Sequence, residues 1–250
     1  MSGTGLDLFI AKLERRAKLS DKARDALLAV PRQRKTFAAY RDLIREGEPT
    51  HACSYIQSGL VSRYKTLSNG SRQILSFHIP GDMVDLQSAL ITVADHGIRT
   101  HVTTNVLLLA NRELLEAAAE FPELARALWF DTLVDSSIFR EWTLNVGRRN
   151  ARDRTAHLLL EMAYRLGLID MVRDRTFDLP ISQADLADAV GISPVHLNRS
   201  LQALRADGMI SNVGRRVTIE RWQDMAEMSD FRPVYMHPEG PRLVQQGHRR

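Results

Sequence analysis

The sequence predicts an α+β fold in which a strand-rich segment is followed by a long helix and a helix-turn-helix. Short alternating runs of apolar and polar residues, separated by glycine and proline, occupy residues 37–111. Several short strands at this spacing are typical of a β-barrel, sandwich or roll. A helical pattern spans residues 122–149, and two short helices separated by a glycine turn lie within residues 183–205.

The composition is that of a globular protein. Of the 250 residues, 44% are hydrophobic and 26% are charged, and the formal net charge is +4, which excludes disordered, collagen-like and coiled-coil compositions. The apolar runs are far shorter than the roughly 18 residues that a membrane-spanning helix needs. The N-terminus also lacks the residue order of a secretory signal. We therefore expect a cytoplasmic protein that does not enter a membrane.

The N-terminal elements can be assigned in order. Residues Leu6–Val30 are predicted to be helical, with Ser20 as an N-cap, and Pro31 ends this segment. Within the strand-rich region, Asn69-Gly70 lies between two alternating runs and predicts a tight β-hairpin. A short helix is expected over Arg112–Ala119.

Pro122 suits the first turn of a long helix that runs to about Arg149. Five of its residues recur at 4-3-4-3 spacing and form a candidate dimer seam: Phe130, Val134, Ser137, Glu141 and Leu144. Packing of this stripe on the chain's own β-domain explains the spacing equally well. A further amphipathic helix is predicted over Arg154–Leu166, closed by Gly167.

The most specific pattern lies within residues 181–221. Ser182 can cap a helix over Gln183–Val190, Gly191 permits a turn, and Ser193-Pro194 opens a second helix. Two short helices joined in this way make a helix-turn-helix. Residues 209–219 then alternate around a glycine like a two-stranded wing.

This order of elements resembles the Crp/Fnr family of bacterial transcription regulators. The resemblance covers about residues 20–222 and rests on Arg45-Glu-Gly-Glu48, Tyr55-Ile-Gln-Ser-Gly59, Pro80-Gly-Asp82 and the helix-turn-helix at Gln183–Ser193. It implies a β-roll of the cyclic-nucleotide-binding type, a homodimer joined through the long helix, and binding to palindromic double-stranded DNA. RNA polymerase is a further implied partner.

The expected domains are an effector-binding-like β-roll with its N-terminal helices (1–121), a dimerisation helix (122–149), a winged helix-turn-helix (150–236) and a disordered tail (237–250). By the resemblance, the recognition helix is Pro194–Arg205. The expected base-reading residues are Val195, His196, Asn198 and Arg199. The expected phosphate contacts are Ser182, Gln183, Ser193, Arg205, Arg215 and Arg216.

The effector pocket departs from the family pattern. Cyclic-nucleotide-binding members supply a glutamate for the ribose and an Arg-Ser/Thr pair for the phosphate. Here Leu86 stands at the glutamate position, and Asp95 stands near the phosphate position, where it would repel a phosphate. We therefore do not expect cyclic AMP to bind. The candidate pocket residues are Asp85, Leu86, Gln87, Ser88, His96, Arg99 and Thr100.

The sequence lacks the residues that redox, metal-dependent or catalytic functions would need. Cys53 is the single cysteine, so it cannot form an internal disulfide or by itself build a four-thiolate zinc or iron–sulfur site. The histidines show no spacing that defines a haem or metal site, and we expect no cofactor. The sequence also lacks the cupin His-x-His, the Gly-x-Ser-x-Gly elbow and the Gly-x-x-x-x-Gly-Lys loop. An enzyme is not expected, and the alternative is a ligand-binding module without DNA binding.

Overall fold

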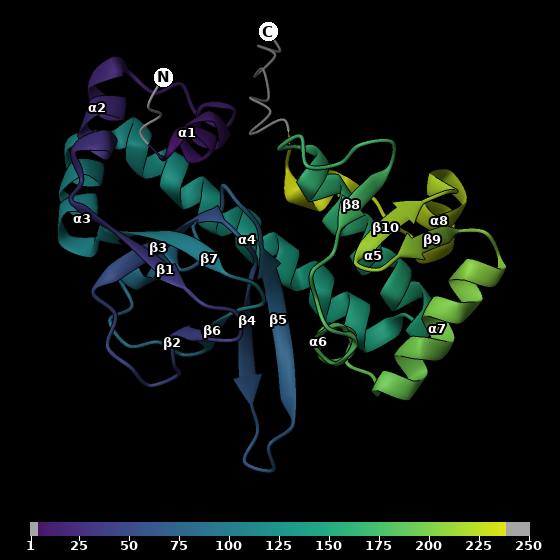
Figure 1. The fold of residues 1–250 in the computed structure, drawn as a ribbon. Helices are drawn as coiled ribbons and strands as arrows, with labels where there is room; N and C mark the ends of the chain where they lie inside the picture. Colours follow the sequence, from purple (N-terminus) through teal and green to yellow (C-terminus); the bar gives the residue numbers. More distant parts are fainter. Residues whose placement is uncertain (1–4, 239–250) are drawn as a thin grey trace, which may run out of the picture.

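The computed structural model describes residues 5–238, which form a strand-rich N-terminal part and a largely helical C-terminal part (Figure 1). The N-terminal part contains α1 (Asp7–Glu14), α2 (Asp21–Ala29), β1 (Arg32–Phe37), β2 (Asp42–Ile44), β3 (Ala52–Ser58), β4 (Val61–Thr66), β5 (Arg72–His78), η1 (Leu86–Ala89), β6 (Gly97–Thr100), β7 (Thr104–Ala110) and α3 (Asn111–Glu120). Its strands form two sheets, ordered β1-β7-β3 and β2-β6-β4-β5. The predicted β-roll is therefore present.

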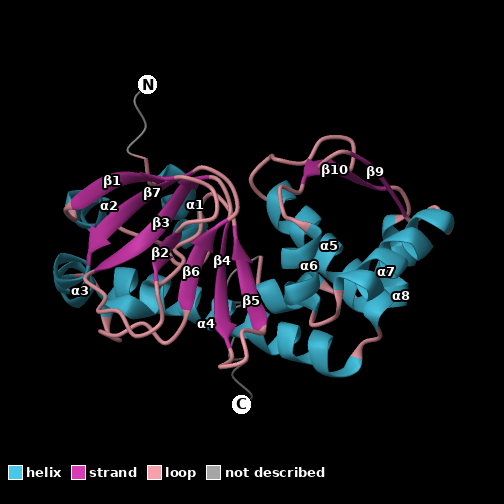
Figure 2. Ribbon diagram, turned by 60° about the horizontal axis from the view of Figure 1, so that its bottom comes forward, coloured by secondary structure: helices cyan, strands magenta, loops and turns pink. Residues whose placement is uncertain are grey.

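Each face of the β1-β7-β3 sheet contributes to a separate apolar core. On one face, Ile56 and Val106 pack with Val61 and Ile98 of the other sheet. Leu109 belongs instead to a second core, shared with α1, α2, α3 and the start of the long helix. The N-terminal helices therefore lie against the roll and tie it to that helix (Figure 2).

Two glycines fix turns of the roll. Gly70 adopts a left-handed conformation (φ +86°) between β4 and β5, which confirms the predicted hairpin. Gly59, between β3 and β4, has φ +103°, and a Cβ atom there would lie 2.4 Å from the Thr104 hydroxyl oxygen. No other residue type fits that position without displacing β7.

The predicted helical segment Leu6–Val30 is two helices, α1 and α2. Ser20 ends the connection between them and caps α2, since its hydroxyl accepts a hydrogen bond from the Ala23 amide at 3.2 Å. The cap itself was predicted. The sequence did not reveal the break, because the connecting residues are themselves compatible with a helix. The Ser20 side chain breaks it by competing for the backbone amide donors.

The long helix α4 spans Pro122–Arg148 with proline in its first turn, and α5 spans Ala151–Gly167. Asn150 caps α5 by accepting hydrogen bonds from the Arg152 and Asp153 amides at 3.0 Å. Therefore α5 begins three residues earlier than the sequence suggested. No helix of residues 5–238 is both long and apolar enough to cross a membrane.

The C-terminal part contains β8 (Thr176–Asp178), α6 (Gln183–Val190), α7 (Pro194–Ala206), β9 (Ile210–Val213), β10 (Arg216–Ile219), α8 (Trp222–Ser229) and η2 (Pro233–Met236). The wing hairpin β9–β10 is present as predicted, and β8 adds a third strand beside β10. Neither β8 nor α8 was predicted. Most of the predicted disordered tail, residues 239–250, lies outside the described residues, whereas the His237 ring contacts Phe130.

Charged side chains join the two parts at two places. Near the β4–β5 hairpin, Arg72 pairs with Asp185 and Asp188 of α6, and the Gln73 amide donates to the Asp188 carbonyl at 2.7 Å. At the other place, the Asp82 carboxylate accepts from Arg165 of α5 at 2.8 Å. These contacts set how the helix-turn-helix is oriented relative to the roll.

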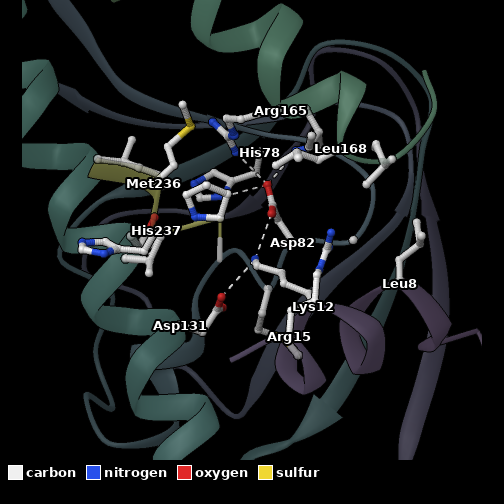
Figure 3. Close-up of a pocket in the computed structure, with 18 of the residues that line it drawn as sticks. Leu8, Lys12, Arg15, His78, Asp82, Asp131, Arg165, Leu168, Met236 and His237 are labelled. Carbon is white, nitrogen blue, oxygen red and sulfur yellow. Dashed lines mark hydrogen bonds and ion pairs between the residues drawn. The ribbon is translucent and has the colours of Figure 1, made fainter. Parts of the chain in front are cut away.

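The Asp82 cluster is the more deeply enclosed of the two. Besides Arg165, Asp82 pairs with Lys12 of α1 at 3.1 Å, and Lys12 reaches Asp131 of α4 at 3.0 Å. Figure 3 shows Lys12 between the two carboxylates. Arg165 also pairs with Glu161 at 3.4 Å. The Asp82 cluster, defined as Lys12, Asp82, Asp131, Glu161 and Arg165, thus connects α1, the roll, α4 and α5.

Candidate nucleic-acid interface

The recognition helix α7 is positioned by α6 and by a tight turn. Gly191 ends α6 in the left-handed conformation (φ +66°), which glycine adopts without steric penalty. Ser193 then caps α7 by accepting from the His196 amide at 3.3 Å. On the inner face, Leu197, Leu201 and Leu204 are buried against α5 and α6. The helix is therefore held along one side and free along the other.

The four predicted base-reading residues all lie on the free side of α7. Val195, His196, Asn198 and Arg199 are exposed, with 61% of Val195 accessible. Sequence reasoning missed Gln202, which is also exposed one turn after Asn198. The signal that could have found it is the helical period, since residues at i and i+4 share a face. An exposed helical face of this kind fits the major groove of duplex DNA.

The six predicted phosphate-contacting residues surround this face but differ in how they are held. Ser182 and Ser193 cap α6 and α7, so their hydroxyls already serve backbone amides. Arg205 donates to the Asn212 side chain in the wing at 2.6 Å, and Arg216 pairs with Asp178 at 3.6 Å. Gln183 and Arg215 are exposed. Cations on α7 and on the wing thus flank the candidate base-reading side chains.

The dimer stripe proposed from the sequence is mostly covered by the chain itself. Val134 and Ser137 are buried, and Glu141 pairs with Arg149 at 2.7 Å. The Arg16 guanidinium lies 5.5 Å from the centre of the Phe130 ring. Of the five residues, only Leu144 is exposed. Four of the five residues are thus wholly or partly covered within the protomer, and Leu144 remains exposed.

A second stripe on α4 is exposed and repeats every three or four residues. Trp129 and Leu133 are 67% and 50% accessible. The exposed stripe consists of Arg126, Trp129, Leu133, Ser136, Arg140, Thr143 and Gly147. It is displaced by one position from the predicted stripe over most of its length. A large exposed tryptophan beside a leucine on a long helix is typical of an interaction surface.

The predicted effector residues do not form one pocket. Asp85, Gln87, Ser88 and His96 line a small space inside the roll, and Leu86 is buried beside them. Arg99 and Thr100 are not part of its lining. This corrects the prediction for these two residues.

Tertiary contacts explain why Arg99 and Thr100 point elsewhere. The Thr100 hydroxyl donates to the Ala38 carbonyl at 2.7 Å and accepts from the Arg41 amide at 2.9 Å. The Arg99 guanidinium lies 5.9 Å from the centre of the Tyr40 ring. Both side chains therefore serve the segment between β1 and β2, which the sequence pattern could not indicate.

The space inside the roll does not fit a cyclic nucleotide. It encloses about 10 Å³, which is barely enough for one water molecule. No described cation lines it, whereas Asp85 and Asp95 do. A cyclic phosphate would meet carboxylates there, and their negative charge would repel it.

Asp85 is the one ionisable group buried in that space with a strongly raised pKa. Burial raises the pKa of its carboxyl to about 6, although hydrogen bonds from Ser54 oppose the shift. A carboxyl whose folded-state pKa is raised stabilises the fold at low pH, and this contribution is lost as pH rises from about 4 to about 6.

We therefore expect Asp85→Asn to stabilise the protein at pH 7.5 by about 1–3 kcal/mol. At pH 4 the gain should vanish, because Asp85 is then protonated and resembles the amide. Urea unfolding of both proteins at the two pH values measures this difference. An equal effect at both pH values would contradict the assignment.

Proteins similar to this chain are transcription regulators. The transcriptional activator protein FnrL of Cereibacter sphaeroides is 28% identical over 190 residues, covering 74% of this chain and 75% of FnrL. The nitrogen fixation regulation protein FixK of Rhizobium meliloti is 27% identical over 188 residues, covering 74% of this chain and 82% of FixK. The structure of FixK2 from Bradyrhizobium japonicum matches with a TM-score of 0.74 at 28% identity, covering 80% of this chain and 98% of FixK2.

A β-roll joined by a long helix to a winged helix-turn-helix with an exposed recognition helix defines a DNA-binding regulator. The profile of the cyclic nucleotide-binding domain matches residues 34–121, and that of the Crp-like helix-turn-helix domain matches residues 153–228. The chain belongs to the Crp/Fnr family of transcription regulators. Membership confirms the resemblance drawn from the sequence.

Proposed function

We propose that the chain acts as a homodimer that reads a palindromic promoter site with two copies of α7. The observation that carries this proposal is the exposed side of α7, where Asn198 and Arg199 project from a helix whose other side is fully packed. Arginine pairs bidentately with guanine, asparagine pairs with adenine, and Val195 can contact a thymine methyl group. The four base-reading residues give sequence specificity, and the flanking cations give affinity.

The exposed stripe of α4 is the proposed dimer seam. A two-fold axis through this stripe would pair each α4 with its copy, so that Trp129 and Leu133 become buried on both sides. Two recognition helices related by that axis would enter successive major grooves. The half-sites would then lie about one helical turn of DNA apart.

Two arginine substitutions separate base reading from phosphate binding. Arg199→Ala should cost about 1–3 kcal/mol at one base pair of each half-site. Arg215→Ala should weaken binding to every sequence alike and lower the slope of affinity against salt by about one. Fluorescence anisotropy with a panel of single-base variants of the site, at several salt concentrations, measures both effects. Uniform losses across all sequences for both variants would refute the division of roles.

The setting of this activity is also part of the proposal. The protein acts in the cytoplasm, carries out no catalysis and works with RNA polymerase at the promoter. Within residues 5–238 no three histidine, cysteine or acidic side chains cluster as metal ligands, and Cys53 is buried.

A further inference from the structure

A cavity lies where the N-terminal and C-terminal parts meet, outside the roll. It encloses about 100 Å³ and is lined by α1, the segment after β5, α4, α5 and η2. An apolar cavity of roughly 150 Å³ can hold a benzene molecule. The space at the junction is smaller than that, so its volume limits an enclosed ligand to a few non-hydrogen atoms. Figure 3 shows the side chains that line it.

The floor of the cavity is charged. Lys12, Asp82, Asp131 and Arg165 of the Asp82 cluster line it. His78 also lines it, but burial lowers the pKa of this imidazole well below its ordinary value, so the ring is neutral at pH 7. The charges on the floor are largely matched by their neighbours.

One positive charge is nevertheless in excess around the cavity. Five cations contribute, namely Lys12, Arg15, Arg16, Arg63 and Arg165, against the four carboxylates Asp82, Asp131, Asp135 and Glu161. Arg63 pairs with Asp135 at 2.5 Å, and Arg16 pairs with Asp131. Arg15 lines the exposed rim, and no carboxylate within residues 5–238 pairs with it. The excess charge is therefore carried by Arg15.

The walls of the cavity are apolar. Leu8 and Leu168 line the cavity from α1 and from the end of α5, and they are 42% and 43% exposed. Met236 of η2 and Val134 of α4 add buried apolar surface. A ligand that covered Leu8 and Leu168 would remove exposed apolar area from water, which favours binding.

We propose that this cavity binds a small monoanion with a short apolar chain, such as a short-chain carboxylate. The anionic group pairs with Arg15 at the rim, and the chain lies between Leu8, Leu168 and Met236. Because the lining comes from both parts of the molecule, the bound ligand stabilises the arrangement in which those parts meet. It therefore shifts the population toward this orientation of the helix-turn-helix.

The binding step can be tested on the full chain without DNA. Butyrate is the probe, with 1-butanol and butylamine as neutral and cationic controls of the same chain length. Saturation-transfer NMR should detect butyrate binding in the millimolar range, with weaker binding of both controls. Arg15→Ala should weaken butyrate binding about tenfold or more, whereas Lys18→Ala, which removes an exposed cation outside the cavity, should leave it unchanged. Equal binding of butyrate and butanol, or equal losses in both variants, would overturn the site.

The regulatory step rests on the proposed DNA-binding function and is measured separately. The dissociation constant for the selected DNA site should change when sodium chloride is replaced by sodium butyrate at constant ionic strength. By linkage, DNA should change butyrate affinity by the same factor. Binding of butyrate with no change in DNA affinity would overturn the coupling, while failure of the ligand-free protein to bind any DNA would count against the proposed function instead.

Discussion

Replacing Asp82 with alanine is expected to destabilise the protein by about 3–5 kcal/mol. Asp82 accepts from Lys12, Arg165 and the Ile79 amide, at distances of 3.1, 2.8 and 3.1 Å. Without the carboxylate, Lys12 and Arg165 would keep only Asp131 and Glu161 as partners and would lose the shared anion that lies between them. Breaking a buried pair by removing one partner costs far more than removing an exposed pair, because the other charge stays desolvated.

Urea unfolding at fixed protein concentration measures this effect. Glu116→Ala is the matched control, since it removes a carboxylate from an exposed pair with Arg112 at 2.8 Å, where about 0.5 kcal/mol or less is expected. A loss in Asp82→Ala no larger than that of the control would show that the Asp82 cluster does not hold the two parts together.

The same cluster predicts a dependence on pH. Burial alone would raise the pKa of Asp82, but Lys12 and Arg165 outweigh it and hold the pKa well below its ordinary value. A carboxyl with a lowered folded-state pKa stabilises the fold above its unfolded pKa of about 4. This contribution is therefore lost as pH falls below about 4, and Asp82→Ala should lack that part of the acid sensitivity.

The second large effect is expected at the exposed stripe of α4. Leu133→Glu should raise the dimer dissociation constant by at least about a thousandfold, because each dimer contains the substitution twice. Truncation of a central interface residue costs about 2 kcal/mol or more of binding free energy. A buried unpaired carboxylate adds a desolvation penalty. Sedimentation velocity over a range of concentrations measures the dissociation constant directly.

The control for Leu133 is Leu90→Glu, which places the same charge on another exposed leucine of the roll. Leu90→Glu should leave the dimer intact. If Leu133→Glu dimerises like the unsubstituted protein, another face of the molecule forms the dimer. Both variants should have the same circular dichroism spectrum, because neither leucine is buried in the protomer.

The recognition unit was predictable because its signals are local. Ser182 and Ser193 cap the two helices, and Gly191 supplies the left-handed turn. Each of these residues acts on backbone groups within a few positions, so the sequence alone reveals the geometry. The observed bounds of α6 match the predicted ones, and α7 extends the second helix by one residue.

The sequence did not separate two neighbouring stripes of α4 that have the same spacing. Val134 and Ser137 lie on one stripe, and Leu133 and Ser136 lie on the other. Spacing cannot tell which stripe the rest of the chain will cover. The ion pair between Glu141 and Arg149, and the contact of Arg16 with Phe130, are tertiary and decide the outcome.

The ion pairs of the Asp82 cluster could not be predicted from the sequence for the same reason. Lys12 and Asp131 are far apart along the chain, and nothing local to either residue predicts that they pair. The candidate effector residues were only partly predictable from the sequence. The sequence indicated that the family's phosphate site is missing, but the contacts of Thr100 with residues 38–41 required the fold.

The central claim is that the chain is a dimer that reads DNA through α7, and selection from random duplex DNA tests it most directly. The purified, ligand-free protein is incubated with the pool at a stated salt concentration, and the retained duplexes are sequenced. We predict enrichment of a palindrome with half-sites about one helical turn apart, and loss of preference at one base pair per half-site in Arg199→Ala. Retention of no preferred sequence, or of a site without two-fold symmetry, would contradict the account.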